Sequence, residues 1–91
     1  MSKTFDMELF LASVLTGSYT TRQRHLRQAK IIQTTIVNRW NLENPWIWQR
    51  KHLIWFLNNS ANNKSTSTHY YYVLTARLIV SRLKKGWRLP K

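Results

Sequence analysis

Side chains capable of acid–base or metal chemistry are scarce in this sequence. The chain holds three acids and three histidines, which are Asp6, Glu8, Glu43, His25, His52 and His69. Asp6 and Glu8 are two residues apart and would face different ways on a helix. The histidines are far apart in the sequence, and with no cysteine there is no thiolate ligand or disulfide framework. We therefore expect no metal, no cofactor and no small-molecule substrate.

Motifs for nucleophilic catalysis are also missing. Ser and Thr are plentiful, but the sequence shows none that is paired with a general base and with a third residue that orients this base. The two glycines, Gly17 and Gly86, cannot form a glycine-rich phosphate loop. The run of tyrosines at positions 70–72 lies within a predicted helix, where packing or backbone contact is favoured over a nucleophilic role. We expect the protein not to be an enzyme.

The abundant charged side chains are basic, and they indicate phosphate as the partner. Fifteen Lys and Arg stand against three Asp and Glu, a formal net charge of +12. All of these basic residues except Lys3 follow residue 21, where Glu43 is the only acid. An ordinary solvated face would carry interspersed acids that relieve this repulsion. Nucleic acid would neutralise the charge with release of counterions.

Length and composition indicate a single folded domain that does not span a membrane. Ninety-one residues form a single domain, 1–91, and a hydrophobic content of 43% excludes a disordered basic tail. No apolar run approaches the roughly 20 residues that a membrane span needs. The N-terminus lacks the pattern of a signal peptide, since Asp6 and Glu8 follow Lys3 closely. We expect a cytoplasmic protein, nucleoid-associated if bacterial, that does not bind membranes.

Apolar periodicity predicts an all-α, compact four-helix bundle, with helices at about residues 5–16, 20–40, 45–58 and 68–85. In the first helix, Phe5, Leu9 and Ala12 recur at helical spacing, with Leu11 and Leu15 one turn earlier or later. The second begins at a Thr20 or Thr21 cap. Its predicted buried stripe comprises Leu26, Ala29, Ile32, Ile36 and Trp40.

The second half of the chain is predicted to hold the other two helices. Asn44-Pro45 is typical of a helix start, and the third helix includes Trp48. The polar run 58–67 is expected to be a connector. The fourth helix ends at Gly86. Its predicted apolar face comprises Tyr72, Ala76, Ile79, Val80 and Leu83.

The aromatic residues allow two interpretations. Trp40, Trp48 and Trp55 are most simply core, because a small bundle needs large side chains to bury enough surface. Stacking on unpaired bases is the alternative. Both interpretations stay open for Tyr70, Tyr71 and Trp87, which lie near basic residues.

From about Phe5 to Pro90 the helix order resembles the N-terminal SAM-like core-binding domain of tyrosine recombinases, of the phage integrase and Xer type. The matching segments are MELFLASVLTG, SYTTRQRHLRQAKIIQTTIVNRW, WQRKHLIWFLNNS and KSTSTHYYYVLTARLIVSRLKKGWRLP. The third segment departs from the family, which usually opens this helix on Thr or Ser where this chain has Trp48. The catalytic domain that normally follows is absent, so no catalytic residue is carried over.

The resemblance implies a domain that grips duplex DNA, mostly through phosphates. The residues it implies as contacts are Arg22, Arg24, Arg27, Arg50, Lys51, His52, Lys64, Thr66, Ser67, Thr68, His69 and Arg77. Physical reasoning agrees, because helix starts favour phosphate and Ser and Thr hydroxyls bind its oxygens. Arg can also pair bidentately with guanine.

The sequence thus predicts a double-stranded DNA-binding protein in a DNA-recombination or mobile-element context. The alternative is a small phage- or plasmid-encoded regulator that docks on an acidic protein or binds single-stranded nucleic acid. Binding of a membrane surface is disfavoured, because all four helices need their apolar faces for the core. Self-association stays open.

Overall fold

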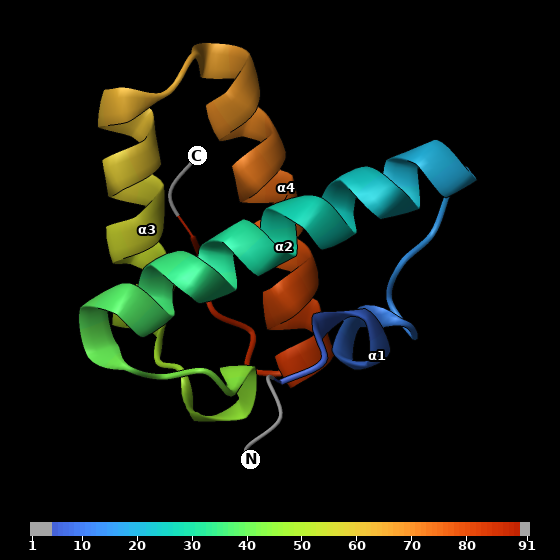
Figure 1. The fold of residues 1–91 in the computed structure, drawn as a ribbon, viewed down its shortest axis with the longest axis horizontal. Coiled ribbons are helices and arrows are strands. Elements are labelled where there is room, and N and C mark those ends of the chain that lie inside the picture. Colours follow the sequence, from blue (N-terminus) through green and yellow to red (C-terminus); the bar gives the residue numbers. More distant parts are fainter. Residues whose placement is uncertain (1–4, 90–91) are drawn as a thin grey trace.

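Two long helices, α3 (Arg50–Asn63) and α4 (Thr66–Leu83), form a hairpin in the computed structural model, which describes residues 5–89 (Figure 1). Helix α2 (Tyr19–Trp40) crosses this hairpin and packs against both of its helices. The short helix α1 (Met7–Leu11) lies against α2 and α4, and the 3-10 helix η1 (Pro45–Ile47) lies against α4. Within residues 5–89 there is no strand, so the chain is an all-α bundle of four α-helices, as predicted.

The core is built from the periodic apolar positions of α2 and α4. In the predicted α2 stripe, Leu26, Ala29, Ile32 and Ile36 are buried, whereas Trp40 is half-buried and packs against them. All five predicted positions of α4 are buried. Because α4 contacts every other helical segment that the structure describes, it is the central element of the bundle.

The first helix differs from its prediction of 5–16. Helix α1 covers only Met7–Leu11, capped by Asp6, whose Oδ1 accepts a hydrogen bond from the Leu9 amide at 3.1 Å. Met7, Phe10 and Leu11 are buried, while Leu9 is 73% exposed. The predicted face is thus partly correct: Leu11 is buried and Phe5 and Leu15 pack against the core, whereas Leu9 and Ala12 are exposed.

Helix α2 begins after Ser18 and not at Thr20 or Thr21. The Ser18 Oγ accepts a hydrogen bond from the Thr21 amide at 3.2 Å, which satisfies one of the free amides of the first turn. At the other end Asn41 adopts a left-handed conformation, with φ of 58°. Its amide donates to the Val37 carbonyl at 2.7 Å and closes the helix.

The predicted third helix, 45–58, is two elements. Asn44 and Pro45 start a helical turn as predicted, with the Asn44 Oδ1 accepting from the Trp46 amide at 2.9 Å. This turn is the 3-10 helix η1, which ends at Trp48. The Trp48 indole is buried and donates from Nε1 to the Leu42 carbonyl at 2.8 Å. Helix α3 therefore starts only at Arg50.

The predicted polar connector 58–67 is almost entirely helical, which corrects the prediction. Helix α3 continues to Asn63 and α4 starts at Thr66, so only Lys64 and Ser65 join them. The Asn63 Nδ2 donates to the Asn59 carbonyl at 2.8 Å, so this polar side chain bonds to the helix itself. The Ser65 Oγ caps α4 by accepting from the Thr68 amide at 3.2 Å.

After α4 the chain reverses and returns along the same helix. Lys84, with φ of 59°, ends the helix at the place predicted for Gly86. Gly86 also has a positive φ, of 67°, which suits a residue without Cβ. Trp87 and Leu89 then pack against the core. The returning segment, residues 84–89, thereby forms one wall of the surface described below.

Candidate nucleic-acid interface

Helix α4 has one open face opposite its buried one. Residues on the open face follow helical spacing of three and four, so they form one stripe. The stripe comprises Thr66, Tyr70, Leu74, Arg77 and Ser81, and Lys84 follows directly past the end of the helix. Three surface hollows adjoin this stripe, and Arg77 lines all three. This surface brings together side chains from several predicted contact regions.

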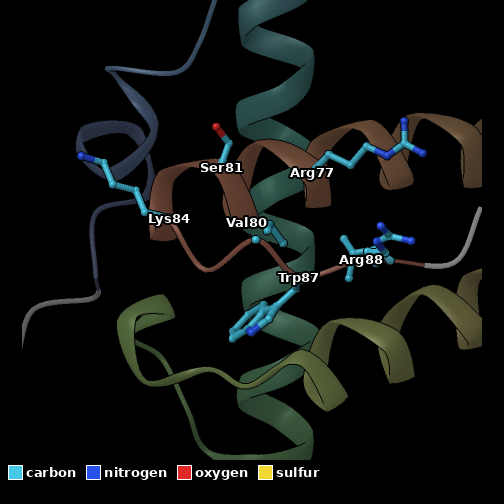
Figure 2. Close-up of a pocket in the computed structure, with 8 residues that line it drawn as sticks. Arg77, Val80, Ser81, Lys84, Trp87 and Arg88 are labelled. Carbon is cyan, nitrogen blue, oxygen red and sulfur yellow. The ribbon is translucent and has the colours of Figure 1, made fainter.

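The largest of these, which we call the basic hollow, has a volume of about 470 Å³ and lies between α4 and the returning segment. Its lining comprises Arg77, Val80, Ser81, Lys84, Gly86, Trp87, Arg88 and Leu89. Figure 2 shows the Arg77 and Arg88 side chains on the same side of it, while the Trp87 indole points away from them. Lys84 extends at the opposite end of the hollow (Figure 2). Three cations therefore border a single depression.

A further arginine joins this group from α3. The Arg50 Nε donates a hydrogen bond to the Arg88 carbonyl at 2.8 Å, although the two residues are 38 positions apart. Arg50 is the first residue of α3, where the helix dipole adds positive potential. The fold thus connects Arg50, Arg77 and Arg88, which come from three separate segments.

The second hollow, which we call the apolar hollow, has a volume of about 440 Å³ and follows the first half of α4. It is lined by Thr66, His69, Tyr70, Val73, Leu74 and Arg77. The third, of about 270 Å³, is lined by Thr16, His25, Leu74, Arg77 and Leu78. No carboxylate of the described residues lines any of the three, so nothing in their walls offsets the charge of Arg77.

An arginine of α2 makes a cation–π contact with an aromatic pair next to the apolar hollow. The Arg24 guanidinium lies over the Tyr71 ring, 4.4 Å from its centroid. The Tyr71 ring meets the Tyr70 ring edge-on, with centroids 5.6 Å apart. Tyr70 is 57% exposed, whereas Arg24 and Tyr71 are half-buried. The start of α2 is thereby linked to the open face of α4.

The acids of the chain are occupied elsewhere. The Glu43 Oε1 accepts from the Phe5 amide at 2.7 Å, and Asp6 caps α1. Glu8 lines a separate hollow together with Arg22. Among the described Lys and Arg side chains, all are exposed except Arg24 and Arg82, which are half-buried. The open face of α4 is therefore a region of uncompensated positive charge.

The histidines have structural partners. The Thr75 hydroxyl donates to Gln28 Oε1 at 2.8 Å, so it accepts from the His25 Nδ1–H at the same distance. Burial, and then the nearby charge of Arg24, lowers the pKa of His25 below 6.5. Burial, followed by Lys51, likewise lowers the pKa of His52.

His52 is buried, which removes it from the predicted contacts. Its Nδ1 accepts a hydrogen bond from the Gln49 amide at 2.9 Å, and its ring lies 4.6 Å from the Trp40 ring. The side chain therefore stabilises the start of α3 and is closed to DNA. Its place beside Arg50 and Lys51 in the sequence suggested a contact that its orientation forbids.

The other predicted contacts divide into two groups. Thr66, His69 and Arg77 line the hollows along α4, while Arg50 and Arg24 contact residues next to them, the Arg88 carbonyl and the Tyr71 ring. The remaining ones lie elsewhere. Arg22 lines a hollow with Glu8, and Lys64 lines another with Asn63. Thr68 is half-buried at the cap of α4, and the exposed residues that line none of these hollows are Arg27, Lys51 and Ser67. The predicted residues are thus only partly brought together.

Sequence reasoning missed Lys84 and Arg88 as members of this surface, whereas it left stacking on a base open for Tyr70. Lys84 follows Arg77 by seven residues, at the end of α4, and that signal was readable. Arg88 carries no such signal, because it depends on the reversal after Lys84. Trp40, Trp48 and Trp55 pack in or against the core as predicted, and Trp87 joins them.

The part of the chain described, residues 5–89, contains no group of His, Cys, Asp or Glu that could hold a metal ion. No helix in this range is long and apolar enough to cross a membrane. The chain matches no protein-family model, no curated protein and no solved structure.

Proposed function

We propose that this protein binds double-stranded DNA through the open face of α4, the returning segment and the start of α3. The observation that carries the proposal is the position of Arg77, at the meeting point of three hollows without an acid in their walls. Arg88 and Lys84 extend the positive surface, and Arg50 is bonded to the Arg88 backbone. Phosphates satisfy such a surface, because each contact releases counterions.

The helix order supports the same proposal. The sequence resembles the core-binding domain of tyrosine recombinases in the order of its helices, and that resemblance implies a domain that grips duplex DNA. We therefore place the DNA binding in a recombination or mobile-element context, as a gripping domain and not as a catalyst. Contacts to phosphate would set affinity, while Arg side chains in the groove would add limited base reading.

A titration with labelled duplex DNA tests this function. We expect micromolar affinity at low salt, because phosphate contacts alone give dissociation constants of roughly 10⁻⁴–10⁻⁶ M at physiological salt and tighter ones below it. Replacing Arg77, Lys84 and Arg88 together by Gln should weaken binding at least tenfold and reduce the slope of log K against log salt by about three. Fluorescence anisotropy over a salt series measures both.

The matched control removes the same charge elsewhere. Arg27, Lys30 and Lys51 are exposed and line none of the hollows, so their replacement by Gln should weaken binding less. Equal losses in both triple variants would overturn the assignment to the α4 face. Absence of a shift with any duplex at low salt would overturn DNA binding and favour an acidic protein partner. An affinity that does not change with salt concentration would contradict binding through phosphate contacts.

A further inference from the structure

The apolar hollow on α4 lies directly beside the proposed phosphate surface but has a different chemistry. Val73 and Leu74 contribute aliphatic wall, Tyr70 an exposed ring, and Arg77 the cation shared with the basic hollow. Its volume of about 440 Å³ falls within the range of small-ligand sites. A phosphate alone would leave this aliphatic and aromatic wall unused. Its occupant must therefore combine a flat apolar group with a neighbouring anion.

Tyr70 is held as a stacking platform by its neighbours. Its ring meets Tyr71 at 5.6 Å, and Tyr71 is covered by the Arg24 guanidinium at 4.4 Å. The chain of contacts from Arg24 through Tyr71 restrains a ring that is itself 57% exposed. A restrained exposed ring loses little conformational freedom when a planar group stacks on it.

His69 contributes its ring to the wall of the apolar hollow. The buried Ser60 Oγ donates to the Leu57 carbonyl at 3.1 Å, so it accepts from the His69 Nδ1–H at 2.8 Å. Among residues 5–89, Nε2 has no hydrogen-bond partner and is covered by protein. The bond to Ser60 therefore holds the imidazole ring in place in the wall of the apolar hollow.

We propose that the apolar hollow receives one unpaired nucleobase of a bound DNA, stacked on Tyr70, while Arg77 holds the adjacent phosphate. A base unites the required features: a planar face that stacks on Tyr70 and a phosphate fixed next to it, within reach of Arg77. An aromatic side chain of a protein lacks this fixed neighbouring anion. The inference rests on the proposed DNA binding and identifies the preferred substrate as a duplex with a bulged or terminal unpaired base.

The test compares three DNA molecules: a blunt duplex, the same duplex with a single-nucleotide bulge, and that bulge with an abasic residue. We expect the wild-type protein to bind the bulged duplex about tenfold more tightly than either of the others, since stacking of a base on an aromatic side chain gives gains of this order. Tyr70→Phe should keep this preference because it keeps the ring. Tyr70→Leu should lose it, so that this variant binds the bulged and the abasic molecules with equal affinity.

Tyr19→Leu is the matched control. Tyr19 is 68% exposed, but it lines the hollow that contains Glu8, whose charge disfavours a phosphate. This variant should keep the preference for the bulge. A fluorescent adenine analogue in the bulge should be quenched by wild type, Tyr70→Phe and Tyr19→Leu, and left bright by Tyr70→Leu.

The outcomes separate the two proposals. Equal affinity for the bulged and abasic molecules, or a preference that survives in Tyr70→Leu, overturns the base site while leaving DNA binding intact. Failure to bind any of the three molecules at low salt overturns both. If the protein binds the bulged duplex and not the blunt one, the base site is supported, and the bulged duplex is the substrate in place of the blunt one.

Discussion

Single residues in this protein change role according to what they touch. His52 and His69 were predicted to contact DNA, yet these two and His25 each make a hydrogen bond within the bundle. A histidine in a helix gives the same sequence signal whether it faces solvent or another helix. Only the positions of Thr75 and Ser60, on neighbouring elements, reveal two of these bonds. The third, to the Gln49 amide, is local and makes His52 a capping residue.

These histidines predict that acid weakens the fold. Burial lowers the pKa of His25 and His52 below 6.5, so the unfolded chain binds more protons than the folded one just below that pH. Their contribution to stability is therefore complete above the unfolded value and is lost as the pH falls through the folded values. Urea unfolding followed by Trp fluorescence, between about pH 7 and pH 5, should show a decreasing free energy of unfolding.

A substitution identifies the contribution of His52. His52→Asn keeps an acceptor near the Nδ1 position for the Gln49 amide but cannot take up a proton in this range. The decrease between pH 7 and pH 5 should be shallower in this variant, and likewise in His25→Asn. An equally steep decrease in both variants would assign the pH dependence to other groups.

At the scale of elements, the helices with strong apolar periodicity were predictable from the sequence, and the polar ends of helices were not. Helices α2 and α4 have their apolar faces where the spacing placed them. The run from Asn58 to Ser67 has the composition of a connector, yet most of it is helix. The buried Ser60 bonds to His69 of α4, and Asn63 bonds to Asn59 one turn earlier. Packing of α3 on α4 therefore overrides the weak helix propensity of these residues.

Two short elements depend on a single arginine of α4. The Arg82 Nε donates to the Phe10 carbonyl at 2.7 Å, which anchors α1. Its guanidinium lies over the rings of Trp46 and Phe10, with centroid distances of 4.9 and 5.5 Å, which anchors η1 as well. We expect Arg82→Met to lower the free energy of unfolding by about 1–3 kcal/mol, because a partly buried charged hydrogen bond and a cation–π contact are lost. Urea unfolding measures this change.

Arg77 provides the comparison for that variant. It lies on the same helix but is exposed, so Arg77→Met should change the free energy of unfolding by no more than about 0.5 kcal/mol. Equal destabilisation in the two variants would show that loss of charge from α4, and not loss of the anchor, is responsible.

For the whole molecule, repulsion among its positive charges destabilises the folded state. A formal net charge of +12 on 91 residues repels itself, and two of the three acids accept hydrogen bonds from backbone amides. Neutralisation from outside should therefore stabilise the protein. A bound polyanion would act more strongly than simple salt, because it places several negative charges along the same face.

This repulsion predicts a melting temperature that rises with ionic strength. Added NaCl shortens the screening length from about 20 Å near 20 mM to about 7 Å near 200 mM, so the repulsion between exposed cations falls. Differential scanning fluorimetry should show the increase. The variant with Gln at positions 27, 30 and 51 should start at a higher melting temperature and respond less. A melting temperature that is flat or falls with salt would contradict the charge account.

The sequence by itself determined the helical class, the buried faces of α2 and α4 and the excess of positive charge, because periodicity and composition are properties of the chain alone. It also named Arg77 and Arg50 as cations of interest. Only the tertiary structure decided that these two meet through Arg88, that His52 is buried and that Tyr70 stands beside an apolar hollow. The physical reason is that these contacts join segments far apart in the sequence, and their geometry depends on how α2 crosses the hairpin and where the chain reverses after α4.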